Sequence, residues 1–312
     1  MRRRPFHRWC GPCRLDKISA SARPASRHLS RKEMSAREIP VLPASVPALL
    51  HHVRSLADFR LRRATGTYVI EGIRQFVQAF DARHRFQAIL HCPILLQAPI
   101  AEMLVRRLAA AGVPRIRLSP EQFRSISMAE RASGVAAILH QRWTPLEQAH
   151  PGPATCHLVV DYIRSPGNLG TILRTAEAAG AGNIFFTGMA GDPFDPAVVR
   201  ASMGGLFHLP LVRTRPQLLG AWARRHRIRL VALSPHADLL YTDLPPCPRP
   251  TALLLGEERK GLSAELEALA HLAVRLPMPG RADSLNVATA AAIMVYELLR
   301  HRPTAPPARA QG

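Results

Sequence analysis

Three polar segments in the second half of the chain carry residue types that could form a small-molecule site. In one of them, Pro277 lacks a backbone donor and Gly280 reaches conformations closed to other residues, before Ser284-Leu285-Asn286 opens an amphipathic stretch. The chain there should be an exposed loop with free carbonyl groups. Asp283 or Ser284 could cap the helix that follows, whose first N–H groups remain available to a ligand.

The other two segments also follow apolar runs. In the first, Asn168 stands at the expected N-cap of a helix and Arg174 lies six residues later. In the second, Glu257 and Glu258 leave a run of leucines and are followed by two basic residues. Taken singly, Asn168 could be only a helix cap, Arg174 a surface residue, and the two glutamates solvated charges in a turn. Because ligands bind beyond the carboxyl ends of the strands in open α/β sheets, we expect the three loops to converge on one site.

Alternating strands and helices should position these segments. Short, wholly apolar stretches such as 252–255 are typical of a parallel sheet that helices cover on both faces. The expected strands are 157–162, 183–187, 228–233, 251–255 and 271–276, and the expected helices are 169–180, 195–203, 216–226 and 284–300.

A smaller α/β unit is expected before this one. A basic amphipathic helix should begin near Val46 and lead to a strand and turn over 67–72. The stretch 142–156 is rich in proline and is typical of a linker. Further strands are expected at 87–92, 116–118 and 135–140, and further helices at 73–80, 98–111 and 120–126.

The charge of the chain indicates a polyanionic partner, most simply a nucleic acid. The net charge is +20, and only Lys17, Lys32 and Lys260 among the 42 basic residues are lysines. The arginine fork matches phosphate geometry, although a drift toward arginine codons would also produce this composition. A hydrophobic content of 47% is enough to form hydrophobic cores in folded domains. No apolar run is long enough to span a membrane.

The N-terminal extension allows several interpretations. Trp9-Cys10-Gly11-Pro12-Cys13 spells a thioredoxin-like motif, but no strand precedes it, so a redox role is not favoured. Residues 1–38 carry eleven basic residues against three acidic ones and are expected to be disordered. They could be a transit peptide, an RNA-binding arm, or sequence upstream of a start at Met34. Five scattered cysteines fit a reducing compartment, so we expect a cytoplasmic protein, or an organellar one if 1–38 is a transit peptide.

Together, the three segments resemble the motifs of the SpoU family of RNA ribose 2′-O-methyltransferases, within the SPOUT superfamily. Residues 199–204 also resemble this family, and the similarity covers 157–300. Residues 46–140 resemble, more weakly, the separate substrate-binding domain of the family, best at 68–72. The motifs stand here as Asn168-Leu-Gly-Thr-Ile-Leu-Arg174, Gly256-Glu-Glu-Arg-Lys-Gly261, and Pro277-Met-Pro-Gly280 with Ser284-Leu-Asn-Val287.

The resemblance implies S-adenosylmethionine as cofactor, a homodimer and a C-terminal trefoil knot. General folding rules would instead predict an unknotted sheet, because knots are almost absent from proteins. The fold expected is α/β: a knotted parallel-sheet methyltransferase domain over 157–303, after a smaller RNA-binding α/β domain over 41–141. A linker over 142–156 should join them, with a basic extension over 1–40 and a tail over 304–312. No metal and no membrane are expected as partners.

The resemblance also implies residue roles. Arg174, from either subunit of the dimer, would lie beside the target ribose. Because a guanidinium hardly deprotonates, we expect it to stabilise the developing alkoxide and grip a phosphate rather than act as a base. The residues expected to orient it are Asn168, Glu258, Ser284 and Asn286, and those expected around the cofactor are Gly256, Leu276, Met278, Leu285 and Leu233.

Two positions depart from the family pattern. Ser165 stands where many members have an acidic residue, and Glu257 stands where a small or amide residue is common. Adjacent carboxylates at 257 and 258 repel one another unless Arg259 or Lys260 compensates.

Ribosomal RNA is favoured as substrate over tRNA, because this chain has an additional N-terminal α/β domain, whereas the family members that act on tRNA usually carry only short helical extensions. The alternative from another functional class is a non-catalytic protein that binds RNA and keeps the same scaffold.

Overall fold

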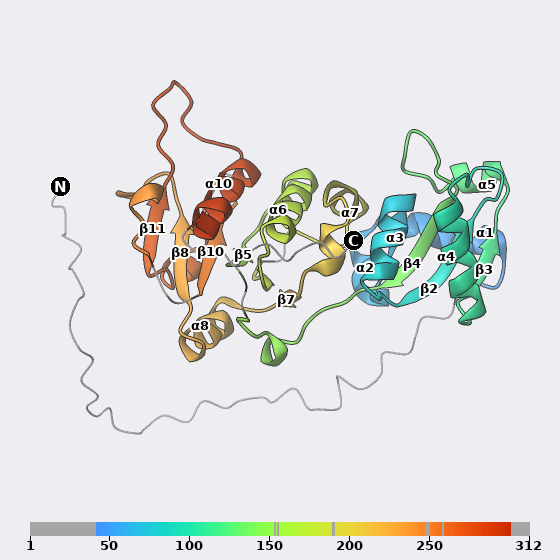
Figure 1. Ribbon diagram of the computed structural model, residues 1–312, viewed down its shortest axis with the longest axis horizontal. Coiled ribbons are helices and arrows are strands. Elements are labelled where there is room, and N and C mark those ends of the chain that lie inside the picture. The colour runs from blue at the N-terminus through green and yellow to red at the C-terminus, as the bar shows by residue number, and fades with distance from the viewer. Residues whose placement is uncertain are drawn as a thin grey trace, which may run out of the picture. The chain divides into compact units, whose positions relative to one another are not determined.

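The computed structural model describes residues 42–152, 154, 156–188, 191–246, 250–257 and 259–300. Figure 1 shows their helices and strands. The motif at Trp9–Cys13, the rest of the N-terminal extension, Glu258 and the tail over 304–312 lie outside the described residues.

A four-stranded sheet forms the first part, in the order β1-β4-β2-β3. The central strand β4 is antiparallel to both neighbours, and β3 is parallel to β2. Tyr68 and Ile70 of β1 face one hydrophobic cluster and Val69 faces another, so helices cover both faces. The elements are α1 (Val46–Ser55), α2 (Phe59–Thr65), β1 (Thr67–Glu71), α3 (Ile73–Asp81), β2 (Phe86–His91), α4 (Pro99–Ala110), β3 (Arg115–Arg117), α5 (Pro120–Arg124) and β4 (Val135–His140).

A seven-stranded sheet forms the second part, in the order β7-β6-β5-β10-β8-β11-β9, and every pair of neighbouring strands in it is parallel. The strands are β5 (His157–Val160), β6 (Ile184–Phe186), β7 (Leu211–Arg213), β8 (Arg229–Leu233), β9 (Leu239–Leu240), β10 (Thr251–Leu255) and β11 (Leu272–Arg275). The helices are α6 (Pro166–Ala178), α7 (Pro196–Ala201), α8 (Pro216–Arg225), α9 (Ala264–Glu267) and α10 (Val287–Arg300), with short 3-10 turns η1 (Leu146–Gln148), η2 (Gly205–His208) and η3 (Tyr241–Asp243).

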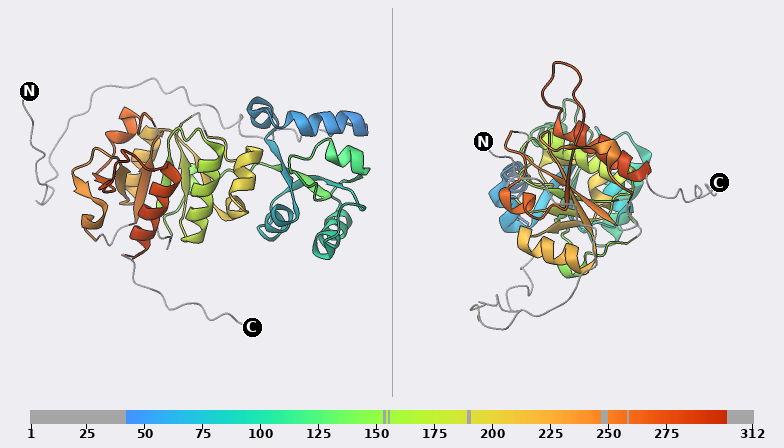
Figure 2. Two further views of the ribbon diagram at one scale, coloured as in Figure 1. Left: turned by 90° about the horizontal axis from the view of Figure 1, so that it is seen from above. Right: turned by 90° about the vertical axis from the view of Figure 1, so that its left-hand side faces the viewer.

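Helices cover both faces of the parallel sheet, as the apolar strands predict. Leu253 and Leu255 of β10 pack in the cluster that contains the buried faces of α6 and α10. Leu254 points the other way, into the cluster that contains α8 and α9. Figure 2 shows α6 and α10 side by side on one face and α8 on the opposite face. No helix in the described ranges is long and apolar enough to cross a membrane.

Two predicted helix starts were wrong. The N-cap of α6 is Ser165, whose Oγ accepts from the Asn168 amide at 3.4 Å, so Asn168 lies inside the first turn. Pro166 follows the cap because its fixed φ suits the first helical position. At α10, Asn286 takes the role expected of Asp283 or Ser284, since its Oδ1 accepts from the Ala288 amide at 2.9 Å. The strands β7 and β9 and the helix α2 were not predicted, because they are too short for a periodic pattern.

A buried arginine joins the four-stranded part to the segment that leads into α7. Arg62 is 1% exposed. Its Nε donates to Asp192 Oδ2 at 2.7 Å and its Nη2 to Asp195 Oδ2 at 3.2 Å. Its Nη1 donates to the carbonyls of Leu56 and Ala57 at 2.8 and 2.7 Å. The guanidinium is thus paired and hydrogen-bonded on every side, which is what a buried charge requires.

Aromatic rings pack at the same junction. Tyr68 of β1 and Phe194 lie with ring centroids 4.7 Å apart. His84 hydrogen-bonds through Nε2 to the carbonyl of Phe207 at 3.0 Å, and burial is the main cause that lowers the pKa of His84. One hydrophobic cluster therefore runs through both sheets. The two parts share this hydrophobic cluster and the Arg62 ion pairs, so their junction is buried and specifically packed.

Replacing Arg62 by leucine should lower the free energy of unfolding by about 3 kcal/mol, because two carboxylates would lose their buried cation. Urea unfolding followed by circular dichroism measures this. Arg63→Leu is the matched control, since Arg63 is exposed on the same helix. Equal losses in the two variants would contradict a structural role for the Arg62 ion pairs.

Candidate functional site

The three polar segments leave the same edge of the parallel sheet. In the strand register, Leu255 of β10 lies beside Val160 of β5, and Leu233 of β8 lies beside Val274 of β11. Because all these strands run in one direction, the loops after β5, β10 and β11 emerge at one edge. In Figure 1, the loop after β11 projects from this edge before it returns as α10. The geometry therefore brings the segments together, as expected for a single site.

A hydrogen bond between two amide side chains connects the first and third segments. Asn286 Nδ2 donates to Asn168 Oδ1 at 2.9 Å. The Oδ1 of the same Asn286 accepts from the amides of Ala288 and Thr289 at the start of α10. The helix N-terminus thereby fixes which end of the Asn286 amide faces Asn168. Asn168 is in turn held at the start of α6 by the cap that Ser165 provides.

The second segment is a tight turn between β10 and α9. Glu257 and Gly261 exchange two backbone hydrogen bonds of 2.9 Å each. A β-carbon at Gly256 would collide with the backbone of Gly261 and Leu262, so this close approach needs glycine. The Glu257 carboxylate lies 3.4 Å from Arg164 Nε, so the cation beside it comes from the loop after β5 and not from Arg259 or Lys260.

Asp161 connects these loops, although it was not among the residues predicted to form the site. It is 2% exposed and directly follows β5. Its Oδ2 accepts from the Ser263 amide at 2.9 Å and its Oδ1 from Thr187 Oγ1 at 3.2 Å. One carboxylate thus holds together the ends of β5 and β6 and the start of α9, which follows the loop after β10. An acidic residue at the end of an apolar strand was the available signal, but its partners lie far away in sequence.

Arg174 is exposed on α6. Within the part of the chain that the structure describes, its side chain makes no hydrogen bond or ion pair. The chain at Gly205 passes close to it, because a β-carbon there would lie 3.2 Å from Arg174 Cα. An unpaired exposed guanidinium of this kind is available to a phosphate or an oxyanion.

The residues expected around a cofactor divide into two groups. Leu276 is buried, and Leu233 and Met278 pack against the main hydrophobic cluster. Leu285 is exposed, as is Ser284, whose Oγ donates to Asp283 at 3.2 Å. The strand ends thus provide an apolar floor, and the loop before α10 provides exposed polar groups. Among the described residues, no group of three or more His, Cys, Asp or Glu side chains could hold a metal ion.

Comparison with known proteins assigns families to both parts of the chain. Residues 155–296 match the SpoU rRNA Methylase family, and residues 49–137 match the MRM3-like substrate binding domain. The 23S rRNA (uridine(2479)-2′-O)-methyltransferase of Streptomyces viridochromogenes is 30% identical, over 79% of this chain and 87% of that protein. The 23S rRNA (guanosine(2553)-2′-O)-methyltransferase RlmP of Bacillus subtilis is 28% identical, over 76% and 90%.

One of the solved structures with a similar fold contains bound AdoMet. The crystal structure of an AdoMet-bound rRNA methyltransferase from Sinorhizobium meliloti has a TM-score of 0.76 and 31% sequence identity, and the match covers 85% of this chain and 98% of that one. The similarity therefore spans both sheets rather than the parallel sheet alone.

Asn286→Ala should lower the free energy of unfolding by about 1 kcal/mol, because it removes a helix cap. Asn286→Asp is the matched control: it keeps Oδ1 as acceptor and loses only the Nδ2 donor to Asn168. We expect the aspartate variant to unfold near the unmodified protein in urea, since a negative charge at a helix N-terminus is favourable. If both variants lost the same stability, the bond to Asn168 and not the cap would be the main contribution.

Proposed function

The chain belongs to the SpoU rRNA methylase family, and we propose that the loops after β5, β10 and β11 transfer a methyl group to a ribose 2′-hydroxyl of structured ribosomal RNA. The protein is an S-adenosylmethionine-dependent RNA 2′-O-methyltransferase. The family and cofactor predicted from the three motifs are thereby confirmed. The observation that carries the proposed site is the meeting of all three motif segments at one sheet edge, joined by the Asn168–Asn286 hydrogen bond.

The residues at the strand ends fit S-adenosylmethionine. The tight turn at Gly256, where the backbone of Gly261 and Leu262 leaves no room for a β-carbon, would place main-chain groups rather than a side chain at the end of β10, where an adenine edge could bind them. Leu276, Met278 and Leu233 offer apolar contact, and Leu285 is exposed in the loop before α10. When bound, the cofactor supplies an electrophilic methyl group on a sulfonium. The protein residues hold it and keep the acceptor hydroxyl in line, which can contribute about 7 kcal/mol or more.

Arg174 would act on the RNA side of the reaction. Its exposed guanidinium can bind the phosphate next to the target ribose and stabilise negative charge that develops on the 2′-oxygen. It does not serve as the base, because a guanidinium keeps its proton in proteins. Asn168, Ser284 and Asn286, together with Glu258 outside the described residues, would orient Arg174 and the nucleotide.

We also propose that the parallel-sheet domain is a trefoil-knotted homodimer. In support of the knot, β10 inserts between β5 and β8 although it follows both in sequence, and α10 then packs beside α6. In support of the dimer, Ile293, Tyr296 and Leu299 are 36, 52 and 36% exposed at a spacing that repeats along one side of α10. Such an apolar stripe suits a second copy of the chain, whose Arg174 would then complete the site.

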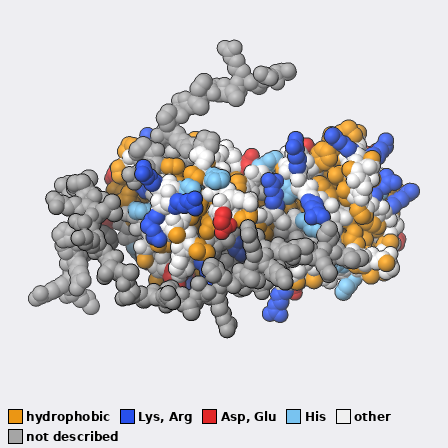
Figure 3. All heavy atoms as spheres, turned by 90° about the horizontal axis from the view of Figure 1, so that it is seen from below, with side chains coloured by type: hydrophobic (Ala, Val, Ile, Leu, Met, Phe, Trp, Pro, Cys, Tyr) orange, Lys and Arg blue, Asp and Glu red, His pale blue; other side chains and the backbone are white. Residues whose placement is uncertain are grey.

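The four-stranded domain is proposed to bind the RNA. Its match to a substrate-binding domain and the high positive charge of the chain support this. Figure 3 shows Lys and Arg side chains spread over one face, with few acidic side chains between them. Two relatives that act on 23S rRNA align over most of their length, which favours ribosomal RNA over tRNA as substrate.

Arg174→Ala should lower the rate of methyl transfer by about 100-fold or more, because the developing oxyanion loses its cation. S-adenosylmethionine binding, measured by calorimetry, should change less than about twofold. Arg225→Ala removes the same charge from α8 on the opposite face of the sheet and should retain full activity. Full activity of Arg174→Ala would refute the assigned role.

RNA affinity should fall steeply with salt, by about 100-fold or more between 50 and 200 mM, if arginines bind phosphates along the strand. Filter binding to ribosomal RNA from cells without this gene measures it. A slope near zero on a plot of log affinity against log salt would contradict phosphate binding.

A further inference from the structure

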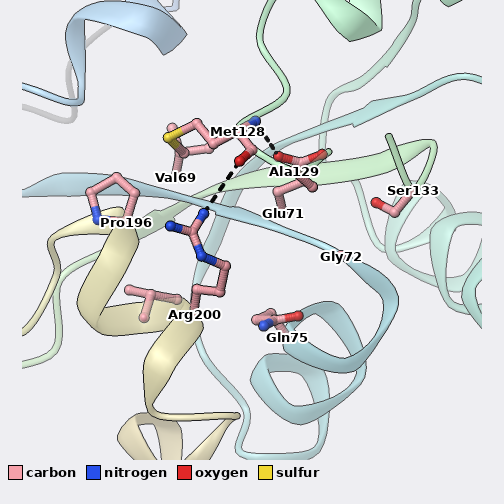
Figure 4. Close-up of a pocket in the computed structure, with 10 residues that line it drawn as sticks. Val69, Glu71, Gly72, Gln75, Met128, Ala129, Ser133, Pro196 and Arg200 are labelled. Carbon is pink, nitrogen blue, oxygen red and sulfur yellow. Dashed lines mark hydrogen bonds between the residues drawn. The ribbon is translucent and has the colours of Figure 1, made fainter. Parts of the chain in front are cut away.

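A pocket of about 190 Å³ lies where the four-stranded sheet meets α7 (Figure 4). Its walls come from the end of β1, the start of α3, the loop over 128–133 and one side of α7. We propose that this pocket binds an unpaired nucleobase of the RNA, at a nucleotide other than the one that is methylated. The proposal rests on the proposed function, because it takes RNA as the substrate.

The size and the apolar walls suit one flat heterocycle. An apolar cavity of about 150 Å³ holds a benzene ring, so a cavity volume of 190 Å³ can hold a single base. The apolar lining comes from both walls: Val69 belongs to β1 and Val199 to α7, and Met128 and Pro196 also line the pocket. Single-stranded RNA is typically recognised by stacking a splayed base on an aromatic ring or on the plane of an arginine guanidinium and by reading its edge, and here Arg200 offers such a plane.

Glu71 provides the polar edge that a base needs. Its Oε1 accepts from Ser127 Oγ at 2.5 Å and its Oε2 from the Met128 amide at 2.8 Å. These bonds hold the carboxylate in one orientation. A carboxylate has about four acceptor positions, so both oxygens can still accept from N–H groups of a base. The site therefore favours a base that presents two N–H donors on one edge, as guanine does through N1–H and its N2 amino group.

Arg200 of α7 lines the pocket, and its side chain reaches across to the loop over 128–133 (Figure 4). Its side chain is exposed, and its Nη1 donates to the Met128 carbonyl at 3.4 Å, which is a long bond (Figure 4). A weakly held guanidinium can turn to a phosphate of the same nucleotide. Exposed arginines also flank two walls in sequence: Arg74 precedes Gln75, and Arg131 lies between Ala129 and Ser133. With Arg200 they outnumber the nearby carboxylates, Glu71 and exposed Glu130, by one. This charge favours a polyanion over a neutral peptide as the occupant.

The pocket is already formed because its two walls are held together. Asp195 caps α7 through Oδ1 and accepts from buried Arg62 through Oδ2. Tyr68 and Phe194, the latter next to Asp195 in sequence, pack against one another with their rings tilted by 46°. A base can therefore enter without a rearrangement of the domains, which lowers the cost of binding.

The helix that forms the pocket wall also packs on the helix that carries the proposed catalytic residues. A β-carbon at Gly170 of α6 would collide with Ala201 and the Val198 carbonyl of α7. Asn168 and Arg174 lie on either side of Gly170 in sequence. A base held by α7 thus has a fixed position relative to Arg174 of the same chain, and its binding would set which neighbouring ribose this Arg174 contacts, whichever subunit of the proposed dimer holds the methyl donor.

Photocrosslinking tests which molecule enters the pocket. The probe is p-benzoylphenylalanine at Met128, with the same residue at Leu218, exposed on α8, as control. Each protein is irradiated with ribosomal RNA from cells without this gene and with a lysate of those cells. We expect one dominant reverse-transcription stop at an unpaired nucleotide for position 128 alone. Stops scattered equally for both positions, RNA capture no greater than at 218, or capture of a polypeptide would overturn the proposal.

Two substitutions test the consequence for the reaction. Ala129→Trp, which fills the pocket, should weaken RNA binding and methyl transfer at least about fivefold, with S-adenosylmethionine binding unchanged. Leu218→Trp is the control for the added ring. Arg200→Ala should weaken RNA binding and lower its salt slope by about one relative to Arg225→Ala. Unchanged RNA binding in Ala129→Trp, with an active unmodified protein, would overturn the pocket alone. No methyl transfer by the unmodified protein to any RNA would overturn the proposed function and this inference together.

Discussion

The common direction of the seven strands is the constraint on which the site depends. Parallel pairing places the carboxyl ends of β5, β10 and β11 at one edge, although other elements separate these strands in sequence. Asp161 then accepts hydrogen bonds from Ser263 and Thr187, so a single buried carboxylate stabilises that edge. Because a buried carboxylate needs hydrogen-bond donors, a shift of these loops that left Asp161 buried without Ser263 and Thr187 would be costly.

Close backbone approach is the second requirement of the site. At Gly256 the chain after β10 touches the backbone of Gly261, and at Gly170 helix α6 touches α7. Any side chain at either position would force the elements apart. These two glycines therefore have structural reasons to stand inside the motifs, separate from any contact with the cofactor.

The two sheets behave as one unit because their junction is buried and charged. Arg62 places a full positive charge among two aspartates and two carbonyls, and the aromatic rings of Tyr68 and Phe194 exclude water beside it. Removing either sheet would leave an ionised group with no partner, which is costly in an apolar interior. The four-stranded domain, proposed to bind the RNA, and the methyltransferase domain can thus keep a set distance.

The sequence by itself determined the local structure and the chemical family. Apolar runs such as Leu253 to Leu255 predict buried parallel strands, and the spacing of Asn168 and Arg174 within one helix identifies the first motif. These features are local, since a strand or helix depends mainly on its own periodic pattern. The motif resemblance likewise needed only residue order, and the comparisons confirm the family and the cofactor.

Only the tertiary structure decided which residues meet. Asn286 and Asn168 are 118 positions apart, and nothing in either local pattern indicates that one donates to the other. The N-cap of α10 is Asn286 and not the predicted Asp283 or Ser284. All three residue types can cap a helix, so the choice depends on the conformation of the preceding loop. Asp161, Arg62 and the pocket beside Glu71 were not recognised for the same physical reason: a buried charge is defined by partners that the fold brings to it, and no local pattern records them.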